Sequence, residues 1–193
     1  EPSTVSRADR PTSFVSADFG VPQGREEDWR FTPMRRVREL LDGDADRAGL
    51  VADVQAPETV LVETVSMDDS RVGAVLAPGD RPAALAYEHS ETALVVTIPR
   101  EVEVSEPVII QVTAPDVPSA GHIVIRGEAL SKATVVLLHS GPAQLLEGVE
   151  VRADDQASLN VVSVHDWDRD ALHTSSHRVS VGRDATLHHM VVT

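Results

Sequence analysis

Residues 133–137 read Ala-Thr-Val-Val-Leu, and a similar pattern returns at 157–162 (Ala-Ser-Leu-Asn-Val-Val) and at 185–187 (Ala-Thr-Leu). Each copy follows a polar corner that contains Gly, Asp or Lys, and each begins with a small alanine and a hydroxyl residue. The first residues of successive copies are 24 and 28 positions apart. Repetition at this period is typical of solenoids, propellers and repeat arrays.

The apolar residues of the chain are mostly aliphatic. Valine supplies 30 of the 193 residues, whereas Phe, Trp and Tyr together supply six. Because β-branched side chains are stiff at χ1 and pack well on a pleated strand, this bias favours strands. Large β-sandwiches usually use aromatic rings to fill their width. We therefore expect residues 93–193 to form the coils of a parallel β-helix, with a β-sandwich as the alternative fold.

Residues 1–43 are predicted to form an N-terminal arm and an amphipathic helix. The arm is rich in Ser, Thr, Asp and Pro. Thr32-Pro33 is a typical helix start, and Gly43 is a typical helix end. The predicted helix has one apolar face, made of Met34, Val37, Leu40 and Leu41.

Residues 44–92 are predicted to be a mixed lead-in of strands and helix. Apolar runs predict strands at 60–65 and 72–76, and residues 82–88 predict a short helix. Beyond Ala93 the pattern is almost entirely strands, including an alternation at 102–104.

The composition excludes several classes of protein. With 17 basic and 31 acidic residues the formal charge is −14, which repels phosphate backbones and argues against nucleic-acid binding. The absence of cysteine excludes disulfides, thiolate metal sites and cysteine nucleophiles within these residues. No apolar run has the length of a membrane span, and the first residues lack the pattern of a signal peptide. We therefore expect no membrane partner and a cytoplasmic location.

Four segments resemble, in the same order, the signatures of a known family. Residues 24–32 (Gly-Arg-Glu-Glu-Asp-Trp-Arg-Phe-Thr) are similar to an element near the start of SufD proteins, scaffold subunits of the SUF iron–sulfur cluster assembly machine. Residues 98–108 resemble the entry into that family's β-helix, with Glu101 where glycine is common. Two shorter elements, Q-D-W and G-R-D-A, have counterparts near the end of the chain. The matching positions outside the 98–108 segment are Arg25, Glu27, Trp29, Arg30, Phe31, Thr32, Asp166, Trp167, Gly182, Arg183 and Asp184.

The resemblance implies a right-handed parallel β-helix behind an N-terminal helical segment. It implies a non-catalytic scaffold that pairs through β-helix edges with a SufB-like paralogue, and that contacts a SufC-like ABC ATPase through a C-terminal helical domain. The assembled complex, rather than a cofactor bound by this chain, would handle the Fe–S cluster. Because family members are longer and solenoids need capped ends, we expect the natural protein to continue beyond Thr193 with that cap and domain.

Two absences agree with the SufD side of this family. SufB proteins tend to carry cysteines used for cluster chemistry, and this sequence has none. It also lacks a phosphate-binding loop motif, and Lys132 is its only lysine, which argues against ATP hydrolysis.

His165, His173 and His177 are the candidate metal ligands. They lie close to several acids, and imidazole with carboxylate suits Fe, Zn or Ni. They define the alternative function, a β-helix or β-sandwich metal-dependent enzyme. The favoured interpretation is that residues 166–176 are a corner insertion with exposed acids and histidines. The acids concerned are Asp166, Asp168 and Asp170.

Other polar groups predict no chemistry. Ser163, His165 and Asp166 could form a hydrolytic triad, but no G-x-S-x-G motif supports one. A carbohydrate-active β-helix is disfavoured because stacking aromatics are few. Trp167 is interpreted as a lid over the corner insertion. His188 and His189 are adjacent and would point to opposite faces of a strand. The remaining histidines are expected to be structural or exposed: His89, His122 and His139.

Overall fold

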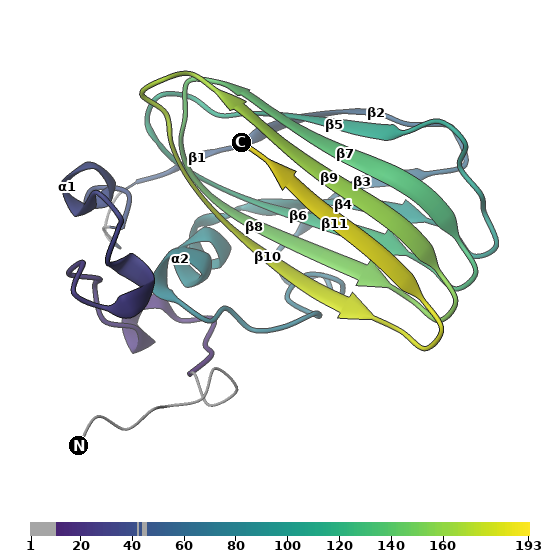
Figure 1. Ribbon diagram of the computed structural model, residues 1–193, viewed down its shortest axis with the longest axis horizontal. Helices are drawn as coiled ribbons and strands as arrows, with labels where there is room; N and C mark the ends of the chain where they lie inside the picture. Colours follow the sequence, from purple (N-terminus) through teal and green to yellow (C-terminus); the bar gives the residue numbers. More distant parts are fainter. Residues whose placement is uncertain (1–10, 42, 44–45) are drawn as a thin grey trace.

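From Thr92 onward the chain alternates between two sheets and winds into a parallel β-solenoid of about four turns (Figure 1). The structure is a computed structural model that describes residues 11–41, 43 and 46–193. One sheet contains β4 (Thr92–Ile98), β6 (Pro118–Gly127), β8 (Gln144–Ala153) and β10 (Leu172–Val181). The other contains β5 (Val108–Thr113), β7 (Lys132–Gly141), β9 (Ser158–Trp167) and β11 (Thr186–Val192). Neighbours within each set run parallel. The predicted solenoid is therefore confirmed, and the β-sandwich alternative, a fold of antiparallel sheets, is wrong.

The strand register corrects the repeat that the sequence suggests. Ala133 pairs with Leu159, so it does not stack on Ala157. Lys132 pairs with Ser158, so the residue at the level of Ala157 in the preceding coil is Ser131. The stacked coils are therefore 26 residues apart here, and 28 residues apart between β9 and β11. The two additional residues lie in the corner 168–171, which replaces the two-residue corner 142–143 of the preceding coil.

The polar corners contain residues in the left-handed backbone region. Leu130, Gln156 and Asp184 have φ angles of 64°, 60° and 56°, and they occupy the same corner of successive coils. The amide of Leu130 donates to the carbonyl of Asp155, and the amide of Gln156 donates to that of Arg183, so these turns stack. Glu101 also has a positive φ, 63°. Glycine adopts this conformation without strain, which explains why glycine suits the position of Glu101 in the resembling family.

Three lead-in strands lie at the first coil: β1 (Ala48–Gly49), β2 (Val51–Gln55) and β3 (Leu61–Ser66). β2 pairs antiparallel with β5, and β3 pairs antiparallel with β4. β1 pairs with the first residues of β6. These pairings satisfy strand edges that would otherwise be open. The strand predicted at 60–65 is thus confirmed as β3.

The helix α2 (Arg81–His89) packs on the outer face of the sheet that contains β6, β8 and β10 (Figure 1). The carboxylate of Asp80 accepts a hydrogen bond from the amide of Ala83 at 2.9 Å, which is a standard N-terminal cap. Leu85 and Leu146 of β8 are buried in one apolar cluster. The helix predicted at 82–88 is therefore confirmed. Among the described helices, none is both long and apolar enough to cross a bilayer.

The N-terminal segment is less helical than predicted. Two 3₁₀ turns, at Ser16–Asp18 and Glu27–Trp29, precede α1, which covers only Met34–Val37. Pro33 holds the N-cap position of α1, and no side chain caps it, so the prediction for Thr32 is wrong. The carbonyl of Leu41 instead accepts a hydrogen bond from the guanidinium of Arg81. A tertiary contact therefore takes one carbonyl at the end of the predicted helix, although the amide of Leu41 still donates to the carbonyl of Val37. Residues 1–10 of the predicted arm lie outside the described residues, as do the neighbours of Gly43 at 42 and 44.

Two predicted strands are absent from the described residues. Residues 72–76 contain a turn at Gly73, whose φ is 73°. The amides of Gly73 and Val75 donate to the carboxylate of Glu150, at 2.7 and 2.9 Å, instead of to a neighbouring strand. Residues 102–104 form only an isolated bridge between Glu103 and Lys132.

Candidate functional site

The interior of the solenoid changes from aliphatic to polar along its axis. The inward side chains of the early coils are mostly Val, Ile and Leu. On β7, Val135 and Leu137 point inward, and the two-residue period places His139 inward as well. On β8 the same argument from Leu145 and Val149 places Glu147 inward. On β10, His173, Ser175 and His177 stack on Leu145, Glu147 and Val149 respectively.

Glu147 is the centre of a hydrogen-bonded group that we call the inner cluster: His139, Glu147 and His173. The two oxygens of Glu147 lie 2.9 Å from His139 Nε2 and 3.1 Å from His173 Nε2. The hydroxyl of Ser175 also donates to Glu147, at 2.8 Å. The side chains of His139 and Glu147 are fully buried, and that of His173 is 7% exposed. A carboxylate buried to this degree needs such partners.

Two contacts determine which ring nitrogens carry hydrogen. Trp167 Nε1 donates to His173 Nδ1 at 3.1 Å, and an indole N–H can only donate. His173 is therefore the neutral tautomer that carries its hydrogen on Nε2 and donates to Glu147. His139 Nδ1 lies 3.2 Å from the carbonyl of Val164, which can only accept. The other ring nitrogen of His139, Nε2, lies 2.9 Å from Glu147.

Electrostatics keeps Glu147 ionised. Burial alone would raise the pKa of Glu147, but the hydrogen bonds from His139 and His173 outweigh burial and hold that pKa well below its usual value. Burial lowers the pKa of His165 to about 4, with further lowering by His139 and His173. Burial also lowers the pKa of His177 to about 4. At neutral pH the interior therefore holds one carboxylate beside several imidazoles, of which His165 and His177 are uncharged.

The three predicted ligands do not meet at one point. His165 Nε2 lies 3.0 Å from the hydroxyl of Ser163, although its ring packs 5.0 Å from that of His173. His177 Nδ1 lies 2.9 Å from His189 Nε2. Within the described part of the chain, the group whose ligand atoms all lie within 4.8 Å of one another is instead the inner cluster. A metal site made of His165, His173 and His177 stays a prediction. Of these three residues, His173 also belongs to the inner cluster.

Residues 166–176 are not a corner insertion. Strand β9 continues to Trp167 and β10 begins at Leu172, so the corner holds four residues. Trp167 is not a lid, because its indole hydrogen-bonds to His173 inside the coil. Asp166 is exposed on the opposite side of β9 from Ser163 and His165, so the hydrolytic triad does not form. The exposure predicted for the acids is correct: Asp166, Asp168 and Asp170 are exposed.

Sequence reasoning missed His139 and Glu147. His139 follows Val135 and Leu137 at two-residue intervals, and this alternation could have placed it on the inward face of the strand. The face of Glu147 was harder to assign, because its neighbours on both faces of the strand are apolar. His188 and His189 lie as predicted: His188 contacts Asn160 on one face, whereas His189 contacts His177 on the other.

A second buried group lies on the outer face of the same sheet, and we call it the outer cluster: His122, Glu150 and Arg178. Glu150 Oε1 lies 2.7 Å from His122 Nε2 and 3.5 Å from the guanidinium of Arg178. The same carboxylate accepts the amides of Gly73 and Val75. Burial alone would raise the pKa of Glu150, but the hydrogen bond from His122 leads the contacts that lower it. This cluster attaches the segment 71–77 to the sheet.

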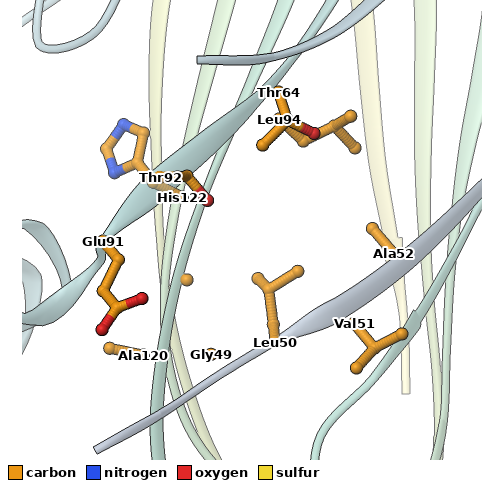
Figure 2. A pocket seen from close by; sticks show the side chains of 11 residues that line it. Gly49, Leu50, Val51, Ala52, Thr64, Glu91, Thr92, Leu94, Ala120 and His122 are labelled. Atoms are coloured by element: carbon orange, nitrogen blue, oxygen red, sulfur yellow. The ribbon is translucent and has the colours of Figure 1, made fainter. Parts of the chain in front are cut away.

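A hollow of about 330 Å³ lies beside the first coils (Figure 2). Leu50 lies in it, and the ring of His122 points away from Leu50. A Cβ atom added at Gly121 would lie only 1.7 Å from Leu50 Cδ2. Because Gly121 pairs with Glu147, Leu50 fills the interior next to the inner cluster. The hollow has no group of converging ligands and is not the candidate site.

The signature positions lie mostly at the surface. Trp29 is half-buried and lines a small pocket with Asp80 and Pro82 at the start of α2. Phe31 is 91% exposed. The remaining positions of this element are exposed or half-buried: Arg25, Glu27, Arg30 and Thr32.

Residues 182–185 form a corner between coils. The amide and guanidinium of Arg183 donate to Asp155, at 2.9 and 3.4 Å. A Cβ atom at Gly182 would lie 2.8 Å from the backbone nitrogen of Asp155. Glycine therefore allows this close stacking. Asp184 supplies the left-handed residue of the corner.

Comparison with known proteins agrees with this architecture. Residues 110–193, which include the inner cluster, match the family model described as SUF system FeS cluster assembly, SufBD core domain. This part of the chain thus resembles a SufBD core domain. No solved structure shows a significant match to the chain.

Relatives of this sequence occur in mycobacteria. A protein of Mycobacterium bovis named as an iron–sulfur cluster assembly SufBD family protein is 41% identical over 183 residues, which are 93% of this chain and 46% of that protein. A protein of the same family name from Mycobacterium leprae is 39% identical over 199 residues, covering the whole chain and 51% of that protein. The chain thus spans about half the length of the curated relatives it matches. These matches support the SufB/SufD family without separating SufD from SufB.

Proposed function

We propose that this chain is part of a non-catalytic scaffold subunit in iron–sulfur cluster assembly, on the SufD side of the SufB/SufD family. The observation that carries the proposal is that the residues matching the SufBD core domain are those that wind into the parallel coils. The names of the mycobacterial relatives support the assembly role. The absence of cysteine from the 193 residues supports the SufD side.

The architecture suits a subunit that holds partners in place. Parallel coils bonded strand to strand make a stiff body, and their edges can pair with a related solenoid. The N-terminal segment is tied to this body through α2, because the amide of Ser16 donates to Glu88 and Arg81 donates to the carbonyl of Ser16. Segment and coils would therefore move as one piece when a partner binds.

The partners in this proposal are a SufB-like paralogue and a SufC-like ATPase in the cytoplasm. Edge pairing would join the two solenoids, and the ATPase would supply the hydrolysis for which this sequence has no motif. The relatives are about twice as long as the chain, so their further residues would carry the ATPase contact. The cluster itself is cargo of the assembled complex.

Native mass spectrometry of the full-length protein, co-expressed with its SufB-like and SufC-like partners, tests the assembly. We expect a complex containing all three subunits, and a control without the paralogue should lose it. A full-length protein that stays alone under these conditions would contradict the proposal.

Complementation tests the choice of SufD. The full-length gene should restore growth under iron limitation to a strain that lacks its SufD-like gene. It should not rescue a strain that lacks the SufB-like gene. Rescue of the strain that lacks the SufB-like gene would contradict the SufD assignment and indicate a SufB-like protein.

A further inference from the structure

The inner cluster directs three potential ligands toward one point inside the solenoid. One ring nitrogen of His139, one oxygen of Glu147 and one ring nitrogen of His173 all lie within 4.8 Å of one another. We propose that these side chains bind one divalent first-row transition metal ion of the Zn²⁺ or Fe²⁺ type. The proposal depends on this geometry and holds whether or not the chain serves cluster assembly.

Two of the three contacts among the ligand atoms have nearly the spacing of metal ligands. His139 Nε2 and His173 Nε2 lie 2.9 and 3.1 Å from the two oxygens of Glu147. Two ligands of a tetrahedral zinc ion, each about 2.1 Å from the metal, are about 3.4 Å apart. The two rings contact different oxygens of Glu147, so one shared ion also requires the two ring nitrogens, which lie within 4.8 Å of each other, to approach to about this separation.

His139 has the orientation that histidine ligands usually have. Its Nδ1 faces the carbonyl of Val164 at 3.2 Å, which leaves Nε2 directed at the cluster. Histidine ligands typically donate their second N–H to a carbonyl or carboxylate, which fixes the ring and makes it a better ligand. Binding an ion removes the hydrogen from Nε2 and leaves this contact unchanged.

His173 must change its tautomer to bind. An ion on Nε2 moves the hydrogen to Nδ1, where it faces the N–H of Trp167, a group that can only donate. The indole must then turn away from His173. Trp167 is only half-buried, so its N–H can reach water instead. Metal binding is thus coupled to a movement of Trp167 that fluorescence can detect.

The donor set determines the class of ion. Two imidazoles and one carboxylate form the ligand set of many zinc sites and of non-haem Fe²⁺ sites. Three protein ligands leave at least one position for water or an exogenous ligand. Mg²⁺ and Ca²⁺ prefer all-oxygen surroundings and should not compete.

The test titrates the metal-free full-length protein with Zn²⁺ alone and with Co²⁺ as a spectroscopic probe, and measures bound metal per chain after desalting. We expect Glu147→Gln to bind one ion fewer than the wild type, and His139→Gln and His173→Gln to bind at least tenfold more weakly. His188→Gln, which removes an exposed histidine, is the matched control and should bind like the wild type. A thermal melt of each variant checks folding.

Several results would overturn the proposal. Equal metal content in the wild type and in a folded Glu147→Gln variant would remove Glu147 from the site. Loss of the ion in His165→Gln or His177→Gln, with retention in Glu147→Gln, would assign it to the other histidines. Competition by Mg²⁺ would contradict the donor set. In a Trp29→Phe background, Zn²⁺ should change the emission of Trp167, and unchanged emission would contradict binding by His173.

Discussion

The inner and outer clusters lie on opposite faces of one strand, three residues apart on β8. Both place a buried glutamate against histidine. Glu147 contacts two imidazoles and one hydroxyl, all of which can redistribute their hydrogens. Glu150 contacts one imidazole, two backbone amides and the buried guanidinium of Arg178.

The two clusters differ in whether the partners of the carboxylate can change between donating and accepting hydrogen bonds. Backbone amides and a guanidinium are fixed donors, so the outer carboxylate has a permanent structural task. Imidazoles can donate, accept or bind a metal, so the inner carboxylate can change partners without leaving a group unsatisfied. The same pair of residue types therefore gives a structural anchor on one face and a potential ligand site on the other.

The largest predicted effect comes from replacing each carboxylate by its amide. Glu150→Gln removes the carboxylate that contacts the buried Arg178 and places an NH₂ group against N–H donors, so it should cost about 3–5 kcal/mol of unfolding free energy. Glu147→Gln should cost about 1 kcal/mol, because His139 can accept from the new NH₂ while His173 and Ser175 donate to the oxygen. Urea denaturation of the two variants measures the difference.

An exposed ion pair supplies the control for this experiment. Glu103 contacts Lys132 at 2.8 Å, and both side chains are more than half exposed. Glu103→Gln should change the free energy of unfolding less than either cluster variant, because water screens this pair. Equal costs at Glu147 and Glu150 would contradict the distinction between the two clusters.

The apolar wall beside the inner cluster gives the second prediction. Gly121→Ala places a methyl group where Leu50 lies, so it should cost about 1–3 kcal/mol through overpacking. Gly49→Ala is the matched control, because no atom lies within 4 Å of its added Cβ, and its stability should change little. Leu50→Ala should rescue part of the Gly121→Ala loss. Thermal melts of the single and double variants check this, and purely additive losses would contradict the contact.

The third prediction concerns pH and the neighbour of the inner cluster, His177. Its folded pKa of about 4 lies below the value of about 6.5 for an unfolded histidine. The unfolded state therefore binds more protons between these values, so the contribution of His177 to stability is constant above about pH 6.5 and falls on acidification by up to about 1.4 kcal/mol per pH unit. The groups that act on His177 are Glu147, His189, His165 and His139.

The His177→Gln variant isolates this contribution. Its stability should fall less steeply than that of the wild type between pH 6.5 and 4, as measured by urea denaturation at several pH values. Parallel profiles for the two proteins would show that His177 is not held neutral in the fold.

The smallest predicted effect lies at the corners, outside both clusters. Leu130 has a φ of 64°, and a bulky side chain is strained there. Leu130→Gly should raise stability by about 0.5–1 kcal/mol. Ala129→Gly in the same corner, where φ is not positive, should lower stability by a similar amount. A loss of stability at both positions would contradict the strain.

The local sequence pattern was enough to predict helices, whose hydrogen bonds are made within the segment, and strands that repeat from coil to coil. The alternation at Leu94, Val96 and Ile98 predicts β4, and the pattern at residues 82–88 predicts α2. Prediction failed where a distant residue takes the backbone donors. Residues 72–76 have the composition of a strand, but Glu150 binds the amides of Gly73 and Val75 from 75 or more positions away.

The same limit applies to the candidate site. His173 was found because it lies among other histidines and acids in the sequence. His139 was missed because its partners come from other strands, and only the register of β7, β8 and β10 brings it to Glu147.

The sequence by itself determined the aliphatic, valine-rich strands, the corners between them and the repeat of 20–30 residues, because each depends on local side-chain preference and spacing. The tertiary structure alone decided which histidines face the interior and which glutamate meets them. A shift of one residue in register turns a side chain from one face of a strand to the other. The chemistry of this solenoid therefore depends on coil stacking, which no single stretch of the sequence specifies.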